Sequence, residues 1–167
     1  MKKIIVSILL LLPLGLIAQE MKIALVNQNE VFSLMPELPA LQEELIKTVQ
    51  QWEADIASMG EDFNRKYNAF IEQGDTLNEN IRNRRMQEIQ NLEERMQSTR
   101  AAAEEDIQNK RQELYYPVQE KMLKIIKEVG DEDGYAFVLD NNPQIVLYVG
   151  KNAIDITDKV KAKLGIK

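Results

Sequence analysis

"LQEELIKTVQQWEADIASMGEDFNRKYNAF", residues 41–70, sets the architecture of this chain. Its apolar residues recur three or four positions apart, which is the spacing of one face of an α-helix. They are Leu41, Leu45, Val49, Trp52, Ile56, Met59, Phe63, Tyr67 and Phe70. Most of the remaining positions are polar or charged. The pattern therefore predicts a long helix with a single apolar stripe, as in coiled coils.

The stripe is interrupted once and then resumes. The interruption is "EQGDTLNEN", residues 72–80. It contains one residue that favours a helix end and two that suit a helix start: Gly74, Asp75 and Thr76. Apolar residues at helical spacing then continue from Leu77 to Val129. Because a short connection makes two helices antiparallel neighbours, we predict a long helical hairpin with its tip near residue 74.

Folding the chain about this break gives an expected register. It places Ile107 opposite Leu41 and Ile89 opposite Gly60. Residues beyond about 108 then have no partner in the first helix. The apolar residues of segment 114–129 must therefore pack on another part of the chain, and a small sheet is the candidate.

Three short strands and a last helix are predicted outside the hairpin. The strands are Ile23–Val26, Ala136–Leu139 and Ile145–Val149, and "DNNP" at 140–143 is a turn between the last two. "DKVKAKL", residues 158–164, is typical of a short helix, which Thr157 or Asp155 can cap. The predicted fold class is α+β, mostly α: a long antiparallel helical hairpin that projects from a small β-sheet body.

A sheet of three short strands buries little apolar area and usually needs a partner. The simplest partner is another copy of the chain. We therefore expect an oligomer whose subunits share the sheet. The candidate residues of this oligomer body are Ile23, Leu25, Phe137, Val138, Leu139, Ile145 and Leu147.

The first eighteen residues have the pattern of a secretory signal peptide. Lys2 and Lys3 precede the apolar run Ile4–Ile17, and a small residue follows it. The alternative is a membrane anchor, for which the run is short. We expect export to the periplasm and removal of residues 1–18. Residues 19–167 then form a single domain, with a body at 21–40 and 110–167 and an arm at 41–109.

The composition excludes several kinds of chemistry. The chain has 167 residues, no His and no Cys, which removes Ser-His-Asp and Cys-His catalysis and any His or Cys metal site. "DEDG" at 131–134 fails the spacing of a calcium loop and is typical of a helix end. The net charge of −6 argues against nucleic-acid binding. We expect no enzyme activity, no cofactor and no metal.

The order of these segments resembles the Skp/OmpH family of periplasmic chaperones. The specific motifs are "KIALVNQNEVF" at 22–32, "YAFVLD" at 135–140 and "DITDKV" at 155–160. The resemblance implies a homotrimer in which a β body joins three subunits. It also implies that three hairpins surround a cavity, which holds unfolded outer-membrane β-barrel proteins without ATP. The alternative function is a structural or scaffolding coiled-coil protein of the cell envelope.

The charge of this chain differs from that of better-known family members, which are basic. A lipopolysaccharide site is therefore not carried over to this chain, and contact with a membrane surface stays an open alternative. The candidate client-contact residues lie near the tip, where adjacent apolar residues cannot all face one seam between two helices. They are Tyr67, Phe70, Ile71, Leu77, Ile81 and Arg82. For the stripe as a whole, packing in the seam is the favoured interpretation.

Two further positions in the arm carry alternative interpretations. Gly60, in the middle of a helix, is either a flexible point or a site of close helix packing. Arg84 and Arg85 either extend over the seam to pair with an acidic residue, which we favour, or form a local cationic patch.

Overall fold

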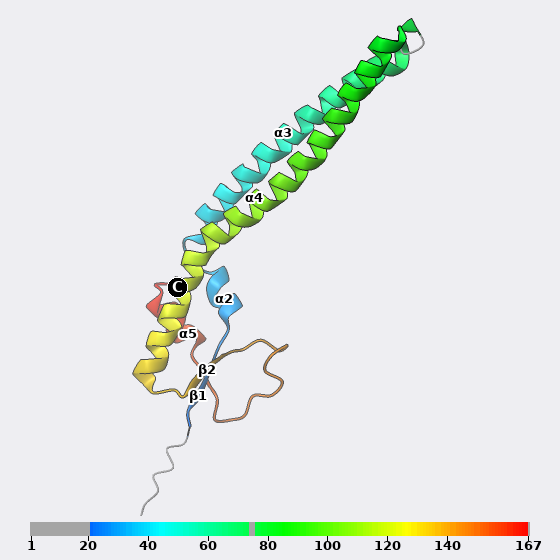
Figure 1. Ribbon diagram of the computed structural model, residues 1–167. Coiled ribbons are helices and arrows are strands. Elements are labelled where there is room, and N and C mark those ends of the chain that lie inside the picture. Colours follow the sequence, from blue (N-terminus) through cyan, green and yellow to red (C-terminus); the bar gives the residue numbers. More distant parts are fainter. Residues whose placement is uncertain (1–20, 74–75, 167) are drawn as a thin grey trace, which may run out of the picture.

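The computed structural model describes residues 21–73 and 76–166. Its elements are β1 (Ile23–Val26), α2 (Gln28–Ser33), α3 (Leu38–Gln73), α4 (Glu79–Asp133), β2 (Phe137–Asp140), β3 (Ile154–Asp155) and α5 (Thr157–Lys163). Figure 1 shows a small body from which α3 and much of α4 project as one long arm. The prediction of a mostly helical fold with long helices and a small three-stranded sheet is confirmed. The predicted signal peptide, residues 1–18, lies outside the described residues.

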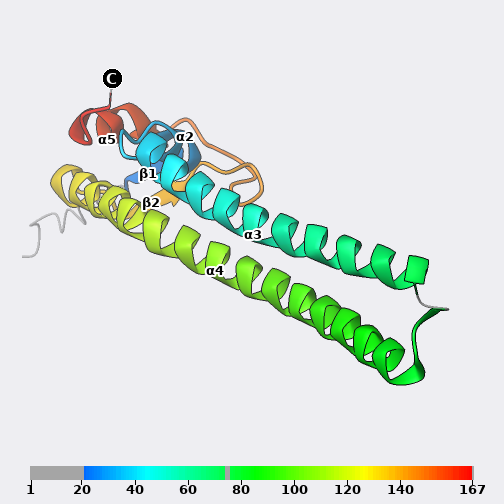
Figure 2. The same ribbon diagram turned by 90° about the horizontal axis from the view of Figure 1, so that it is seen from above.

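The arm consists of α3 and α4, which lie side by side and run in opposite directions (Figure 2). Polar pairs join the two helices at three levels: Glu44 with Lys110, Trp52 with Asp106, and Gln73 with Arg85, at 2.8, 2.9 and 3.0 Å. Later positions in α3 thus pair with earlier positions in α4, so the two helices are antiparallel. The apolar stripe lies between these pairs and is half-buried over most of its length.

The register of the arm differs from the predicted one. A Cβ on Gly60 would lie 3.9 Å from the Met96 side chain, whereas Ile89 was the predicted neighbour. The difference is seven residues, or one heptad. A shift of one heptad returns the same apolar stripe to the seam, so the stripe alone cannot select the register. The cross-helix polar pairs and the connection at the tip distinguish the two arrangements.

The start of α4 also differs from the prediction. Asn78 caps the helix, because its side-chain oxygen accepts a hydrogen bond from the Ile81 N–H at 3.0 Å. Thr76, one predicted cap, instead donates its hydroxyl to the Gln73 carbonyl at the end of α3. The other predicted residues of the tip, Gly74 and Asp75, lie outside the described residues.

The inner half of α4 packs on the body, as predicted for segment 114–129. Four of its apolar residues join one core with residues from β1, α2, the start of α3, and α5. The buried members of this core are Ala24, Val26, Val31, Met35, Leu38, Val118, Met122, Ile126, Val129, Ile156, Val160 and Leu164. Helix α4 then ends at Asp133, within the "DEDG" stretch that was predicted to end it, and Gly134 closes it with a φ of 68°. This left-handed conformation favours glycine.

The sheet has the order β2-β1-β3, and its strands are all parallel. The predicted strand at Ile145–Val149 is wrong, because these residues lie in the connection between β2 and β3. β1 is the central strand, and both of its edges are taken by β2 and by β3, at 154–155. Segment 141–153 is therefore the connection that carries the chain across the sheet, although its apolar composition favours a strand.

The short helices α2 and α5 contact each other and α4, and their buried residues Val31 and Val160 belong to the same core as Ala24 and Val26 of β1 (Figure 1). α2 is capped by Asn27, whose side-chain oxygen accepts a hydrogen bond from the Glu30 N–H.

The N-cap position of α5 is occupied by Ile156 and not by either predicted residue, Thr157 or Asp155. The Asp155 carboxylate just before it accepts a hydrogen bond from the Thr157 N–H at 2.9 Å. Across the described part of the chain, every helix is too short or too polar to cross a membrane.

Candidate functional site

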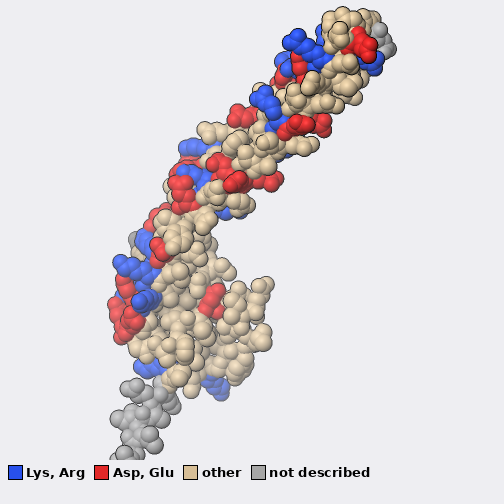
Figure 3. Space-filling view, viewed as in Figure 1, with Lys and Arg blue, Asp and Glu red and all other residues tan. Residues whose placement is uncertain are grey.

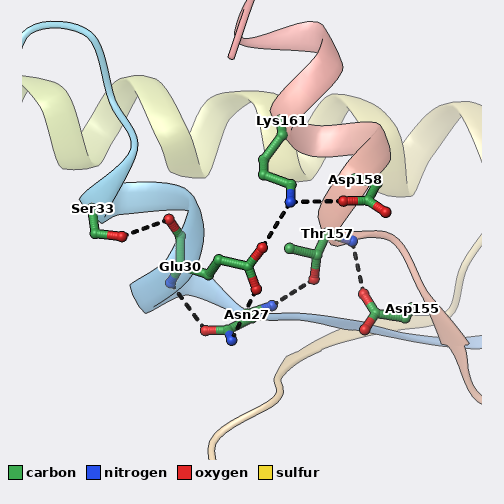
Figure 4. Close-up of polar contacts among 7 residues, drawn as sticks. All are labelled: Asn27, Glu30, Ser33, Asp155, Thr157, Asp158 and Lys161. Atoms are coloured by element: carbon green, nitrogen blue, oxygen red, sulfur yellow. Dashed lines mark hydrogen bonds and ion pairs between the residues drawn. The ribbon is translucent and has the colours of Figure 1, made fainter. Parts of the chain in front are cut away.

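A polar network holds the C-terminal helix against the N-terminal motif, and we call it the clasp: Asn27, Glu30, Ser33, Asp155, Thr157, Asp158 and Lys161 (Figure 4). Asn27, which follows β1, donates its N–H to the buried Thr157 hydroxyl at 2.9 Å. The Asn27 side chain in turn accepts from the Glu30 N–H at 3.1 Å. The clasp thus satisfies backbone groups where two neighbouring strands end.

Charge pairs complete the clasp. The Lys161 ammonium lies 2.7 Å from Asp158 and 2.7 Å from Glu30, and together these carboxylates raise the pKa of Lys161 above its ordinary value. Two further lysines of α5 pair with the end of α4: Lys159 with Asp133 at 2.6 Å, and Lys163 with Glu132. α5 is therefore joined to both α2 and α4. The clasp is built from the two motifs at 22–32 and 155–160 and from the residue that follows each of them, Ser33 and Lys161.

The sheet has one packed face and one open face. In the register of β1 and β2, Ile23 lies beside Phe137 and Leu25 beside Leu139, with their side chains on the open face. Phe137 and Leu139 are 56% and 42% exposed. An apolar cavity of about 250 Å³ lies between this face and segment 146–153. Large apolar side chains at the surface of a small sheet are typical of an interaction surface.

The predicted oligomer-body residues fall in three different environments. Val138 faces the core and packs beside Gly130 of α4. Ile23, Leu25, Phe137 and Leu139 belong to the open face, where Leu25 is buried beneath the loop. Ile145 and Leu147 belong to the connection between β2 and β3 and are 69% and 92% exposed. Tyr148, which was not among the predicted residues, is 83% exposed beside them.

The predicted client-contact residues near the tip are also distributed over two environments. Tyr67, Ile71 and Ile81 are exposed, and so is Arg82. Phe70 and Leu77 are half-buried. The Tyr67 ring is stacked on Phe63, with centroids 5.8 Å apart.

Within the described residues, neither Arg84 nor Arg85 makes the predicted pair with an acidic residue across the seam. Arg85 donates to Gln73 across the seam, and Arg84 lies 3.4 Å from Glu88 on its own helix. Figure 3 shows charges of both signs along the arm, whereas the side of the body that carries the connection from β2 to β3 has few charges. The charges are therefore concentrated on the arm, and the side of the body with few charges carries the exposed side chains of Ile145, Leu147 and Tyr148.

The sequence interpretation missed the contacts at the root of the arm. Glu37, just before α3, pairs with Lys121 of α4, and this hydrogen bond lowers the pKa of the Glu37 carboxyl. Phe32 of α2 contacts Tyr115 of α4 edge to face, with centroids 6.2 Å apart. The residues lie far apart in the chain, and spacing alone gives no signal for such contacts. Within residues 21–73 and 76–166, no cluster of acidic side chains could hold a metal ion.

The fold and its exposed surfaces define a helical-arm protein built on a small parallel sheet. The chain belongs to the outer membrane protein (OmpH-like) family, whose model matches residues 22–164.

Individual relatives agree with this assignment. "Chaperone protein Skp" of Pectobacterium atrosepticum is 26% identical over 139 residues, which cover 83% of this chain and 82% of the relative. The protein of the same name from Photorhabdus luminescens is 26% identical over 131 residues, covering 78% and 79%. A crystal structure described as an OmpH-like outer membrane chaperone from Caulobacter crescentus CB15 superposes with a TM-score of 0.70 at 16% identity, covering 86% of this chain and 83% of the other. That likeness supports the fold.

Proposed function

We propose that this protein is an ATP-independent periplasmic holdase that binds unfolded outer-membrane proteins and prevents their aggregation. The observation that carries the proposal is the combination of an open apolar sheet face on the body with a projecting arm that exposes apolar side chains near its tip. Holding an unfolded chain needs surface and reach, and the arm provides both. The relatives named as Skp chaperones support the same role.

The proposal assigns separate tasks to the two parts of the chain. The open sheet face and the exposed connection at 141–153 join three subunits, because burying these side chains against copies of the chain removes apolar area from water. The tip residues contact the client. Residues 1–18, which lie outside the described residues, direct export to the periplasm, and residues 19–167 form one functional unit. No catalytic residue and no cofactor is assigned.

Dilution of a urea-denatured outer-membrane β-barrel protein into buffer tests this function. The protein lacking residues 1–18 should suppress light scattering when present at about one trimer per barrel. The tip variant Ile71→Ser with Ile81→Ser should suppress it less. Its matched control is Ile46→Ser with Leu123→Ser, which also removes two exposed aliphatic side chains, but away from the tip. Assembly without any holding would favour the scaffolding alternative.

A further inference from the structure

The chain enters the body at the open face of the sheet. Met21, the first described residue, is 65% exposed and lines the apolar cavity of about 250 Å³ between this face and segment 146–153. Residues 1–20 lie outside the described residues. Because the chain is continuous, the segment that precedes Met21 ends at this cavity.

The open face and the run Ile4–Ile17 have matching chemistry. None of the described residues that line the cavity is charged. Phe137, on the same face, is 56% exposed. The run Ile4–Ile17 is apolar and also contains no charged residue. Contact between the run and the face would therefore remove apolar area from water on both sides.

The tether between the run and the face is short. Ile17 precedes Met21 by four residues, and four residues span at most about 14 Å. The strands β1 and β2 have four residues each and are about 13 Å long. Because the two lengths are similar, the tether lets the run reach the side chains of the face. So short a tether gives an effective concentration of roughly 1 mM.

We propose that, before residues 1–18 are removed, the run Ile4–Ile17 covers the open sheet face and keeps the full chain from assembling. The run and a second copy of the chain then compete for one face. At about 1 µM protein, the tethered run has roughly a thousandfold advantage in concentration over a second copy. This inference rests on the proposed function, in which the open face joins the subunits and residues 1–18 direct export.

The competition links assembly to export. Once residues 1–18 are cleaved, the run is no longer tethered and loses its advantage in concentration. A second copy can then occupy the face. Since removal of a signal peptide accompanies export, subunits join only in the compartment where they meet their clients.

Light scattering of three forms, each refolded from urea, tests the inference. The mature form, residues 19–167, should be oligomeric at micromolar concentration. The full chain, residues 1–167, should be monomeric there, and its assembly should require at least about 100-fold more protein. The matched control is the full chain with Leu9→Ser, Leu10→Ser, Leu11→Ser and Leu12→Ser, which keeps the length of the segment. This control should assemble like the mature form.

Three results of this experiment would contradict the inference. A full chain that assembles like the mature form would show that the run does not cover the face. Larger particles of the full chain, absent from the Ser control, would show that the run contacts other molecules and not its own body. A Ser control that stays monomeric would show that the length of the segment, and not its apolar character, prevents assembly.

A second measurement detects the contact itself. A benzophenone side chain in place of Phe137 should crosslink to residues 4–17 within one full chain, whereas in the mature form it should join two chains. The same group in place of Leu123, which is 44% exposed on α4, should give neither product. This assay separates the two proposals: a monomeric mature form would refute assembly through the open face, and a missing crosslink within the full chain would refute coverage by the run.

Discussion

Removal of the arm separates assembly from client holding. We would cut the arm at the ion pair between Glu44 of α3 and Lys110 of α4, in which the Lys110 Nζ lies 2.8 Å from the Glu44 Oε1. This pair shows that the two helices are adjacent at this level. We would replace residues 45–109 with a flexible Gly/Ser linker of about six residues, which is long enough to join two adjacent helices. The sheet, α2, α5 and the inner half of α4 all remain.

The body should tolerate this deletion. Of the fifteen buried apolar residues in the described part of the chain, two, Leu92 and Ala103, lie within the removed segment. The remaining core is intact, so we expect the free energy of unfolding of the body to change by ~1 kcal/mol, or about 4–8 °C in Tm for a domain of this size. What is lost is reach: α3 extends about 44 Å beyond Glu44 at ~1.5 Å per residue.

Circular dichroism, light scattering and the barrel-dilution assay check the three consequences. The armless protein should stay folded, keep the oligomeric mass of the full protein and fail to keep a denatured barrel in solution. An armless protein that is folded but monomeric would show that the arms drive assembly. One that still suppresses aggregation at stoichiometric amounts would place the client surface on the body, and the assignment of the arm would be wrong.

Three other predictions concern the sheet, the arm and its root. Leu139→Asp, on the open sheet face, should give a protein that is folded by circular dichroism and monomeric by light scattering. Val138→Asp should instead unfold the body, because it buries an unpaired carboxylate. Equal effects of the two variants would contradict a sheet with one packed and one open face. Gly60→Ala should stabilise α3 by ~1 kcal/mol in thermal unfolding without loss of holding, since its Cβ meets only ordinary contact; lost holding would instead indicate a hinge. The hydrogen bond from Lys121 lowers the pKa of Glu37, so its contribution is present above the unfolded-state pKa and lost as the pH falls through the folded pKa. Glu37→Gln should therefore reduce the loss of stability between about pH 5 and about pH 3 in urea unfolding, and an unchanged loss would refute this.

The candidate site was predictable only where it depends on local pattern. The exposure of Ile71 and Ile81 near the tip agrees with the argument that adjacent apolar residues cannot share one seam. The open face of the sheet was not separable from its packed face, because the strands were too short to show alternation. Val138 was grouped with Leu139 for this reason, although the two side chains point to opposite faces.

The sequence by itself determined the long helices, the break near the tip, the inner segment of α4 that packs on the body, and the family, because these depend on periodicity and on motifs at the chain ends. Only the tertiary structure decided the register of the arm and the topology of the sheet. A heptad shift leaves an apolar stripe unchanged, so the register follows from polar pairs such as Trp52 with Asp106, which exist only once the helices meet. The apolar run at 145–149 has the propensity of a strand, but the chain passes through it as a connection and pairs with β1 only at Ile154 and Asp155. Propensity describes a segment alone, whereas strand pairing depends on how the whole chain crosses the sheet.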